Sequence, residues 1–138
     1  MATFAFEIVT PDKMLFSTQE ATYVGFTAPS GGMGIEANHL PVTAALSVAP
    51  IKVNLADGSV KYFSVCGGFL EMNGTKCTVL ATIAEDGNDI DEARALASQQ
   101  RAQERINAQK AEIDMERANA SLKRAMMRLK TYKYASGK

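Results

Sequence analysis

Four arginines are the residues whose type and spacing most favour binding chemistry: Arg94, Arg101, Arg124 and Arg128. The first two are seven residues apart and the last two are four apart, so each pair shares one face of a helix if its segment is helical. A guanidinium group presents paired N–H donors to phosphate, and four convergent groups would match a polyphosphate. The simpler interpretation is a solvated basic face, or a face that meets acidic protein.

The other reactive residue types do not form a recognisable site. His39 is the only histidine, so neither a multi-histidine metal site nor a convincing catalytic triad can be built. Cys66 and Cys77 lie in apolar segments without a nearby histidine and are expected to be ordinary core thiols. The glycines of residues 31–34 lead into another predicted strand, so they indicate a turn and not a phosphate-binding loop. The sequence therefore predicts no catalytic residue and no metal site.

Composition indicates a small protein with an uneven charge distribution. The chain has 138 residues, 15 basic and 15 acidic side chains, and 46% hydrophobic residues, which suits one core with an appendage. Its start lacks the pattern of a signal peptide, and no stretch is long and apolar enough to predict a membrane span. From Arg117 to the end there are seven Lys or Arg and no Asp or Glu. This basic tail is expected to meet an anionic partner, which could be nucleic acid, lipid, nucleotide or an acidic protein surface.

The first part of the chain shows strand patterns. The segments richest in β-branched and aromatic residues are 4–9, 21–27, 41–48, 51–55, 60–63, 68–70 and 77–80. Asp57-Gly58 and Asn73-Gly74 each stand between two such segments and are typical of β-hairpin turns. Short strands with turn signals about every ten residues predict an antiparallel sandwich or barrel.

The composition changes at residues 85–88. Beyond Ile90 there is no proline and the only glycine is Gly137, while alanine, glutamine, arginine and glutamate dominate. We therefore expect a β-sandwich domain over residues 1–85 and a helical domain over residues 86–138.

Two helices are expected, with a break between residues 107 and 114. Asp89 is the predicted N-cap of the first helix, and Asp91 would complement the helix dipole in its first turn. The second helix has a seam of apolar residues spaced by three and four: Met115, Ala118, Leu122, Ala125, Leu129 and Tyr132. The first has a thinner stripe: Ile90, Ala93, Leu96 or Ala97, and Ile106.

A short connection would make the two helices an antiparallel αα-hairpin. The start of the first helix then lies near the end of the second, where the four arginines can converge with Asp91 and Glu85. Either carboxylate could accept a hydrogen bond from an adenine amino group or a ribose hydroxyl. An alanine-rich seam buries little apolar area, so we expect the hairpin to be weakly held on a stiff sandwich.

Short motifs occur in a specific order over nearly the whole chain: FEIVTPDK at 6–13, GMGI at 32–35, HLP at 39–41, VCGGFLE at 65–71, TVLA at 78–81, IDEARA at 90–95 and LKRAMMRL at 122–129. Each motif is short, but their order and spacing together are specific. The sequence resembles the ε subunit of F-type ATP synthases.

The resemblance implies a ten-stranded β-sandwich followed by the helical hairpin, with a place in the rotor's central stalk. The sandwich would bind the γ subunit and the membrane c-ring. The subunit would not be a catalyst; it would help couple proton or sodium flow to ATP synthesis and, in bacteria, restrain ATP hydrolysis. It would lie peripherally on the cytoplasmic side of the cell membrane, with no required cofactor, no nucleic-acid partner and no direct lipid insertion.

The resemblance also implies three sets of contact residues. With the hairpin folded, ATP as a regulatory ligand would contact Glu85, Ile90, Asp91, Arg94, Ala95, Arg101, Arg124 and Arg128. With the hairpin open, the second helix would climb along γ into the ring of α and β subunits and meet an acidic segment of β through Lys123, Arg124, Arg128, Lys130 and Lys133. The rotor contact would involve Gly34, His39 and Leu40. ATP and the β subunit would thus use Arg124 and Arg128 in mutually exclusive states.

One loop departs from the family pattern and belongs to its rotor contact. Residues 36–38 are Glu36, Ala37 and Asn38, where relatives usually have an apolar residue, proline and glycine.

Two other functional classes are considered. The first is a stand-alone β-sandwich interaction module whose basic helix binds nucleic acid or an acidic protein. Nucleic-acid binding would weaken steeply with salt, and the basic helix has no aromatic residue before Tyr132. The second is an ATP-consuming enzyme, which the missing G-x-x-x-x-G-K-[ST] loop contradicts.

Overall fold

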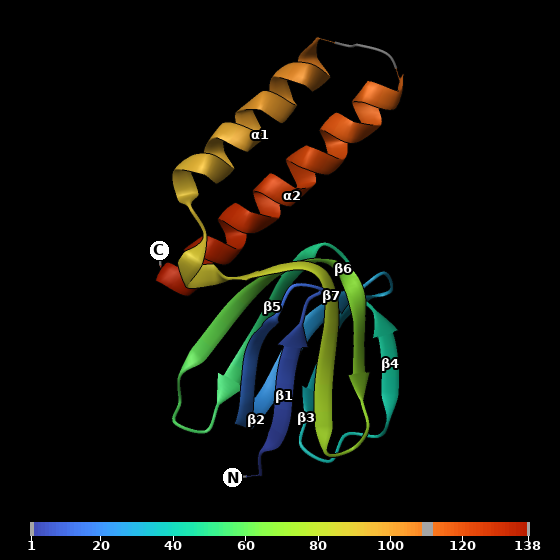
Figure 1. Ribbon diagram of the computed structural model, residues 1–138, viewed down its shortest axis with the longest axis vertical. Helices are drawn as coiled ribbons and strands as arrows, with labels where there is room; N and C mark the ends of the chain where they lie inside the picture. The colour runs from blue at the N-terminus through green and yellow to red at the C-terminus, as the bar shows by residue number, and fades with distance from the viewer. Residues whose placement is uncertain (1, 109–111, 138) are drawn as a thin grey trace.

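The computed structural model describes residues 2–108 and 112–137, in which a β-sandwich carries a helical hairpin at one end (Figure 1). The strands are β1 (Phe4–Val9), β2 (Met14–Ala28), β3 (Gly31–Glu36), β4 (Val42–Ala45), β5 (Ala49–Leu55), β6 (Val60–Met72) and β7 (Lys76–Asp86). Along β1, buried residues alternate with half-buried ones, as expected of a strand with one face on a core. The predicted hairpin turns at Asp57-Gly58 and Asn73-Gly74 are confirmed, because they join the antiparallel pairs β5–β6 and β6–β7.

The strands form one hydrogen-bonded sheet that closes on itself. Its order is β1-β7-β6-β5-β2-β3; β4 pairs with β6, and β1 also pairs with β2, so five strands complete a ring. The predicted antiparallel β-sandwich is confirmed, with one exception among the strand pairs of the described residues: β1 runs parallel to β7, with Phe6 beside Cys77. This pairing joins the first and last strands of the chain, which no tight turn connects.

The part of the chain that the structure describes contains seven strands and not about ten, because three strands are long and continuous. β2, β6 and β7 have 15, 13 and 11 residues. The predicted segments 60–63 and 68–70 join in β6 through Gly67 and Gly68, whose φ angles are +80° and +125°. A Cβ atom on Gly68 would lie 2.1 Å from the Leu80 carbonyl oxygen, so only glycine allows β6 to cross this close to β7.

The sandwich has its own hydrophobic core. Its largest fully buried side chains include Phe6, Phe63, Ile8, Ile35 and Leu70. All buried members of this core cluster lie between Phe4 and Ala81, so the helices contribute none of them. The aromatic and branched side chains bury far more apolar area than the alanines of the hairpin, which makes the sandwich the stable part.

The hairpin consists of α1 (Glu92–Asn107) and α2 (Glu112–Ser136), joined to β7 by the short 3₁₀ helix η1 (Gly87–Asp89). The predicted break between the helices is confirmed, although residues 109–111 of the connection lie outside the described residues. The predicted seam of α2 is also confirmed, since Ala118, Ala125 and Leu129 are buried.

The predicted contact stripe of α1 is wrong in its middle part, although its ends Ile90 and Ile106 are buried and half-buried. Ala95 and Ala102 are buried, whereas Ala93, Leu96 and Ala97 are exposed. The two buried alanines are seven residues apart, like Ala118 and Ala125 on α2. Small side chains on both faces allow the helices to pack closely, so side-chain size and not hydrophobicity selects this face.

Residues 86–91 fix the hinge between the sandwich and the hairpin. The Asp86 carboxylate accepts a hydrogen bond from the Asn88 N–H at 2.9 Å and pairs with Lys61 at 2.8 Å. The N-cap of α1 is Asp91 and not the predicted Asp89, because Asp91 Oδ1 accepts the Arg94 N–H at 3.0 Å. Asp89 instead ends η1.

The C-terminal turns of α2 dock the hairpin onto the sandwich, and α2 lies between α1 and the sandwich (Figure 1). The rings of Tyr62 on β6 and Tyr134 on α2 lie 5.3 Å apart. Next to them, a Cβ atom on Gly87 would lie 2.8 Å from both the Ala135 Cβ and the Tyr62 carbonyl oxygen, and 3.2 Å from a methyl of Thr131. The missing side chain at Gly87 therefore allows α2 to approach β6.

Candidate functional site

A pocket of about 410 Å³ lies where the hairpin meets β6 and β7, a size typical of small-molecule sites. The sandwich supplies one wall, formed by Ser64, Cys66, Ile83, Ala84 and Glu85. The hairpin supplies the other, formed by Ser98, Ser121, Arg124, Ala125 and Arg128. We call it the arginine pocket. Its walls come from two strands and both helices, so the pocket is complete only while the hairpin is docked.

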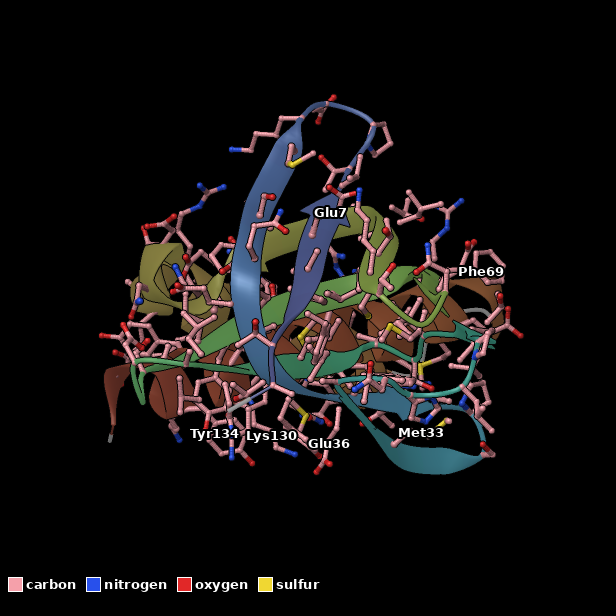
Figure 2. The ribbon with its side chains drawn as sticks, turned by 90° about the horizontal axis from the view of Figure 1, so that it is seen from below. Glu7, Met33, Glu36, Phe69, Lys130 and Tyr134 are labelled. Atoms are coloured by element: carbon pink, nitrogen blue, oxygen red, sulfur yellow. The ribbon has the colours of Figure 1, made fainter. Side chains whose placement is uncertain are left out.

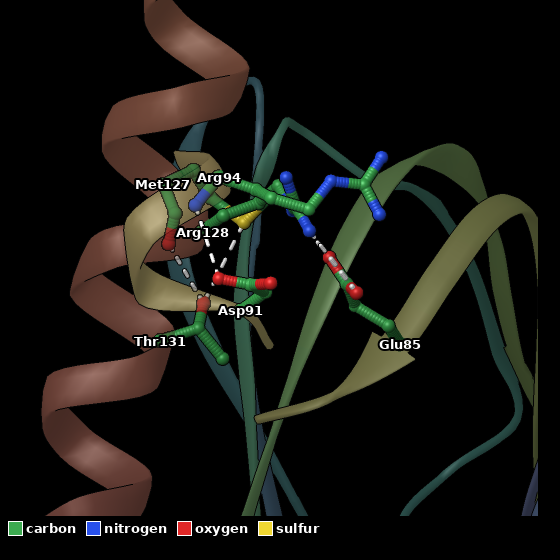
Figure 3. Close-up of polar contacts among 6 residues, drawn as sticks. All are labelled: Glu85, Asp91, Arg94, Met127, Arg128 and Thr131. Carbon is green, nitrogen blue, oxygen red and sulfur yellow. Dashed lines mark hydrogen bonds and ion pairs between the residues drawn. The ribbon is translucent and has the colours of Figure 1, made fainter. Parts of the chain in front are cut away.

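Glu85 and Arg128 form an ion pair across the arginine pocket (Figure 3). Arg128 Nε donates to Glu85 Oε1, and a second nitrogen, Nη2, lies 3.4 Å from Oε2. Both side chains are less than one-third exposed, and two-point geometry strengthens such a pair. Because Glu85 is on β7 and Arg128 is on α2, the pair helps to hold the hairpin against the sandwich. An anionic ligand would compete with Glu85 for Arg128.

Two further arginines are each oriented by a serine three residues earlier on the same helix. Arg124 Nη2 donates to Ser121 Oγ at 3.2 Å, and Arg101 Nη2 donates to Ser98 Oγ at 3.1 Å. Both serines line the arginine pocket. Neither arginine forms an ion pair with a side chain of residues 2–108 or 115–137, so within these ranges both keep N–H donors for an anion.

The structure brings only part of the predicted set together. Among the eight expected ATP contacts, those that line the arginine pocket are Glu85, Arg124 and Arg128. Arg94 is exposed and lies one turn before Ser98 on the same face of α1. In Figure 3 the side chains of Arg94 and Arg128 extend in the same direction. Arg101 borders the pocket through Ser98 but itself lines a separate hollow near the end of α1.

The remaining three predicted contacts have structural roles in this conformation. Asp91 caps α1, as described above. Ile90 and Ala95 are 4% and 0% exposed, so their side chains pack inside the protein and do not line the pocket. A ligand could reach these residues only through their backbone or after a local rearrangement.

Sequence reasoning found three of the ten residues that line the pocket and missed the others, among them Cys66, Ile83, Ser98 and Ser121. The serines had a detectable signal, because each precedes an arginine of the predicted set by three residues on a helix. Cys66 and Ile83 had none, because they become neighbours only through the β6–β7 register.

The two cysteines differ in environment. Cys66 is partly exposed in the pocket, whereas Cys77 is fully buried. Burial raises the pKa of the Cys66 thiol above its ordinary value, while the positive charges of Arg124 and Arg128 oppose this rise and Glu85 adds to it. Burial alone raises the pKa of Cys77 to about 12. Cys66 is therefore a natural reporter for occupancy of the pocket.

The predicted rotor-contact residues lie in β3 and in the loop that follows it, and Gly34 pairs with Gly25 of β2. Leu40 is 80% exposed, and the ring nitrogen Nδ1 of His39 donates to the Leu40 carbonyl oxygen at 2.6 Å. Gly34 lies beneath Tyr23, whose ring would be 2.7 Å from a Cβ atom at this position. In the unusual loop sequence, Asn38 adopts φ +64°, a left-handed conformation that asparagine tolerates better than most residues other than glycine.

The basic residues predicted to contact the β subunit do not share one face of α2. Arg124 and Arg128 face the arginine pocket, whereas Lys130 lines a different groove beside Tyr134. Lys123 and Lys133 are exposed. In the docked conformation the helix therefore presents its positive charges in several directions.

An apolar patch lies on the outer surface of the sandwich, on another side of the molecule from Lys130 and Tyr134 (Figure 2). Phe69 and Leu80 are cross-strand partners that are 57% and 54% exposed. With Val9 and Pro11 they line a shallow groove of about 360 Å³. Exposed apolar residues that cluster in this way are typical of a protein-binding surface.

Among the side chains of residues 2–108 and 115–137, no cluster of three or more His, Cys, Asp or Glu is placed to hold a metal ion. No helix in the described part of the chain is both long and apolar enough to cross a membrane.

Comparison with known families matches both parts of the chain. Residues 3–87 match the model described as ATP synthase, Delta/Epsilon chain, beta-sandwich domain. Residues 88–133 match the model described as ATP synthase, Delta/Epsilon chain, long alpha-helix domain.

Individual proteins show the same similarity over most of their length. The chain is 41% identical over 129 residues to the ATP synthase epsilon chain of Bacillus cytotoxicus, covering 94% of this chain and 96% of that relative. It is 38% identical to the ATP synthase epsilon chain of Symbiobacterium thermophilum, covering 94% and 93%. Among solved structures, a chain of the Euglena gracilis mitochondrial ATP synthase is similar in fold, with a TM-score of 0.81 and 18% identity over 91% of this chain and 79% of that one.

Proposed function

The chain belongs to the ATP synthase epsilon chain family, and on this premise we propose that it is the regulatory subunit of the enzyme's central stalk. It has no catalytic role of its own. Its sandwich attaches to the rotor, and its hairpin switches between a docked state that binds ATP and an extended state that restrains ATP hydrolysis. The subunit would act peripherally, on the cytoplasmic side of the cell membrane. The stand-alone interaction module is not favoured by this family assignment.

The sandwich offers two surfaces for the rotor. The apolar patch around Phe69 and Leu80 suits the γ subunit, because burying exposed aromatic and aliphatic side chains favours stable association. The loop with the exposed Leu40 suits the c-ring, next to Gly34 and His39. The sandwich has its own core, so these surfaces would stay fixed while the hairpin moves.

The observation that carries the switch is the composition of the arginine pocket. Glu85 and Cys66 come from the sandwich, whereas Arg124 and Arg128 come from α2. The triphosphate of ATP would bind between the arginines, and the ligand would then bridge both parts of the molecule. Such a ligand binds the docked state and not the extended state.

Mass action determines how strongly ATP shifts the equilibrium. A ligand at 100 times its dissociation constant stabilises the conformation that binds it by about 2.7 kcal/mol. That amount is comparable to the free energy expected to dock a hairpin with few large buried side chains. ATP binding would thus withhold Arg124 and Arg128 from the β subunit, and loss of ATP would release them.

Calorimetric titration of the full-length chain with ATP tests the proposal, with Arg124→Ala as the main variant. Removing a charge-assisted hydrogen bond should weaken ATP binding by about tenfold or more. Arg117→Ala is the matched control, because Arg117 is exposed on the same helix and does not line the pocket. ATP should also slow the alkylation of Cys66. If Arg124→Ala and Arg117→Ala bind ATP with equal affinity, the assignment of the pocket is refuted. It is also refuted if saturating ATP leaves the alkylation rate of Cys66 unchanged.

A further inference from the structure

A second groove, of about 370 Å³, lies where the C-terminal part of α2 crosses the sandwich. Its lining residues are Gly25, Phe26, Thr27, Pro50, Lys52, Tyr62, Lys130 and Tyr134. We call it the lysine groove. It shares no lining residue with the arginine pocket.

The strand register forms the sandwich side of the lysine groove. Gly25 on β2 pairs with Lys52 on β5, and Lys52 pairs with Tyr62 on β6. Directly opposed residues of antiparallel strands point to the same face of a sheet. Lys52 and Tyr62 therefore stand side by side on the outer face, next to Gly25, which the ring of Tyr23 covers.

The hairpin forms the facing side. Lys130 and Tyr134 are one turn apart on α2 and so share a face. The Lys130 ammonium lies 5.7 Å from the centre of the Tyr134 ring, which is 5.3 Å from the Tyr62 ring. Figure 2 shows Lys130 and Tyr134 on one side of the molecule. The groove thus holds two Lys–Tyr pairs, one from the sandwich and one from the hairpin.

The charge of the lysine groove is unbalanced. Its lining contains two ammonium groups and no carboxylate. Among the side chains of residues 2–108 and 115–137, neither Lys52 nor Lys130 forms an ion pair, whereas Arg128 in the other pocket is neutralised by Glu85. The volume of about 370 Å³ lies within the range of ligand sites and leaves room for phosphate or pyrophosphate.

We propose that the lysine groove binds a small oxyanion with at least two negative charges, of the phosphate and pyrophosphate class. The ammonium groups of Lys52 and Lys130 hold the anion from opposite sides, and the hydroxyls of Tyr62 and Tyr134 supply further donors. The anion connects β5 and β6 to α2, so its binding favours the docked hairpin. This inference does not depend on the proposed ATP site.

The test is calorimetric titration of the full-length chain with sodium pyrophosphate and, separately, with inorganic phosphate. Lys52→Gln and Lys130→Gln should each weaken pyrophosphate binding by about tenfold, because each removes one charged donor. Lys13→Gln is the matched control, since Lys13 is an exposed lysine of the β1–β2 turn. Hydrogen exchange of α2 amides should slow when pyrophosphate binds to the unsubstituted chain.

A fourth variant, Arg124→Gln, separates this site from the arginine pocket. Pyrophosphate binding that persists in Arg124→Gln and is weakened in Lys52→Gln supports the lysine groove. This result is independent of whether ATP binds the arginine pocket. Binding that is lost in Arg124→Gln and survives both lysine substitutions overturns the proposal. So does the absence of pyrophosphate binding at millimolar concentration.

Discussion

At the scale of single residues, the pKa of the Cys66 thiol depends on the charges of the arginine pocket. Burial raises its pKa, and the neighbouring Arg124 lowers it in part. The thiolate is the reactive form, so the alkylation rate should keep increasing as pH rises past the ordinary thiol pKa. Removing the arginine charge takes away a stabiliser of the thiolate and should move the pKa higher still.

We therefore predict that Arg124→Gln shifts the rate–pH profile of Cys66 alkylation to higher pH and slows the reaction near pH 8. Mass spectrometry after timed iodoacetamide treatment measures this for Cys66 alone, because Cys77 is fully buried. Lys123→Gln, an exposed neighbour on α2, should leave the profile in place. A faster reaction in Arg124→Gln would mean that Arg124 shields the thiol more than it stabilises the thiolate.

Asp91 provides a second prediction for a single residue. Its carboxylate caps α1, so Asp91→Ala should destabilise that helix by about 1 kcal/mol, while Asp91→Asn should cost only a few tenths because asparagine also caps well. Hydrogen exchange of α1 amides measures the difference. Asp89→Ala is the control and should leave α1 unchanged; an effect as large as that of Asp91→Ala would restore Asp89 as the cap.

The position of a residue in the site was predictable from sequence where the helix period alone determines which residues share a face. Arg124 and Arg128 were expected on one face, and the structure places both in one pocket. Asp91 could not be recognised as the N-cap, because nothing in the sequence marks the short 3₁₀ helix that ends at Asp89. Ala95 could not be recognised as buried, because the exposed Leu96 is more hydrophobic.

At the scale of elements, the contact between α2 and the hinge depends on one missing side chain. Gly87→Ala should push α2 away from β6, because the new methyl group would lie 2.8 Å from the Tyr62 backbone oxygen and from Ala135. Overpacking of this kind costs about 1–3 kcal/mol, enough to shift a weakly docked hairpin towards the undocked state. Faster hydrogen exchange along α2, with unchanged exchange in the core strands, is the expected result.

Gly32→Ala is the matched control for this prediction. Gly32 has no atom within 4 Å of a Cβ position and no positive φ, so the same chemical change meets open space. If both variants exchange alike, the close approach at Gly87 does not hold the hairpin.

The ends of strands were predictable where a specific turn sequence follows them. They were not predictable where a strand continues through a proline or a glycine. Asp57-Gly58 and Asn73-Gly74 marked real hairpins. By contrast, Pro50 lies outside the predicted segments 41–48 and 51–55, yet it belongs to β5, near the start of the strand, where proline is tolerated. Gly67 and Gly68 likewise bend β6 without ending it. The predicted segments 60–63 and 68–70 are therefore one strand, whereas the expected count of ten came from the family resemblance and not from these residues.

At the scale of the whole molecule, the β-sandwich has a hydrophobic core of its own and the helical hairpin does not. Because all buried members of the sandwich core lie between residues 4 and 81, a fragment of residues 1–87 should fold and unfold cooperatively. A fragment of residues 88–138 should be largely unfolded, because its seam is made mostly of alanines and short helices are marginal alone. Circular dichroism during urea unfolding measures both. A fragment 1–87 without a cooperative transition would show that the sandwich needs the hairpin.

The central claim is that ATP binds the docked hairpin and excludes the extended one. Distances between spin labels at the exposed positions 71 and 116 test it most directly, using Glu71→Cys and Glu116→Cys in a Cys66→Ser background. Adding ATP should narrow the distance distribution to the single separation of the docked state, and Arg124→Ala should prevent this narrowing. A distribution that stays broad, or moves away from the docked separation, at saturating ATP would contradict the account.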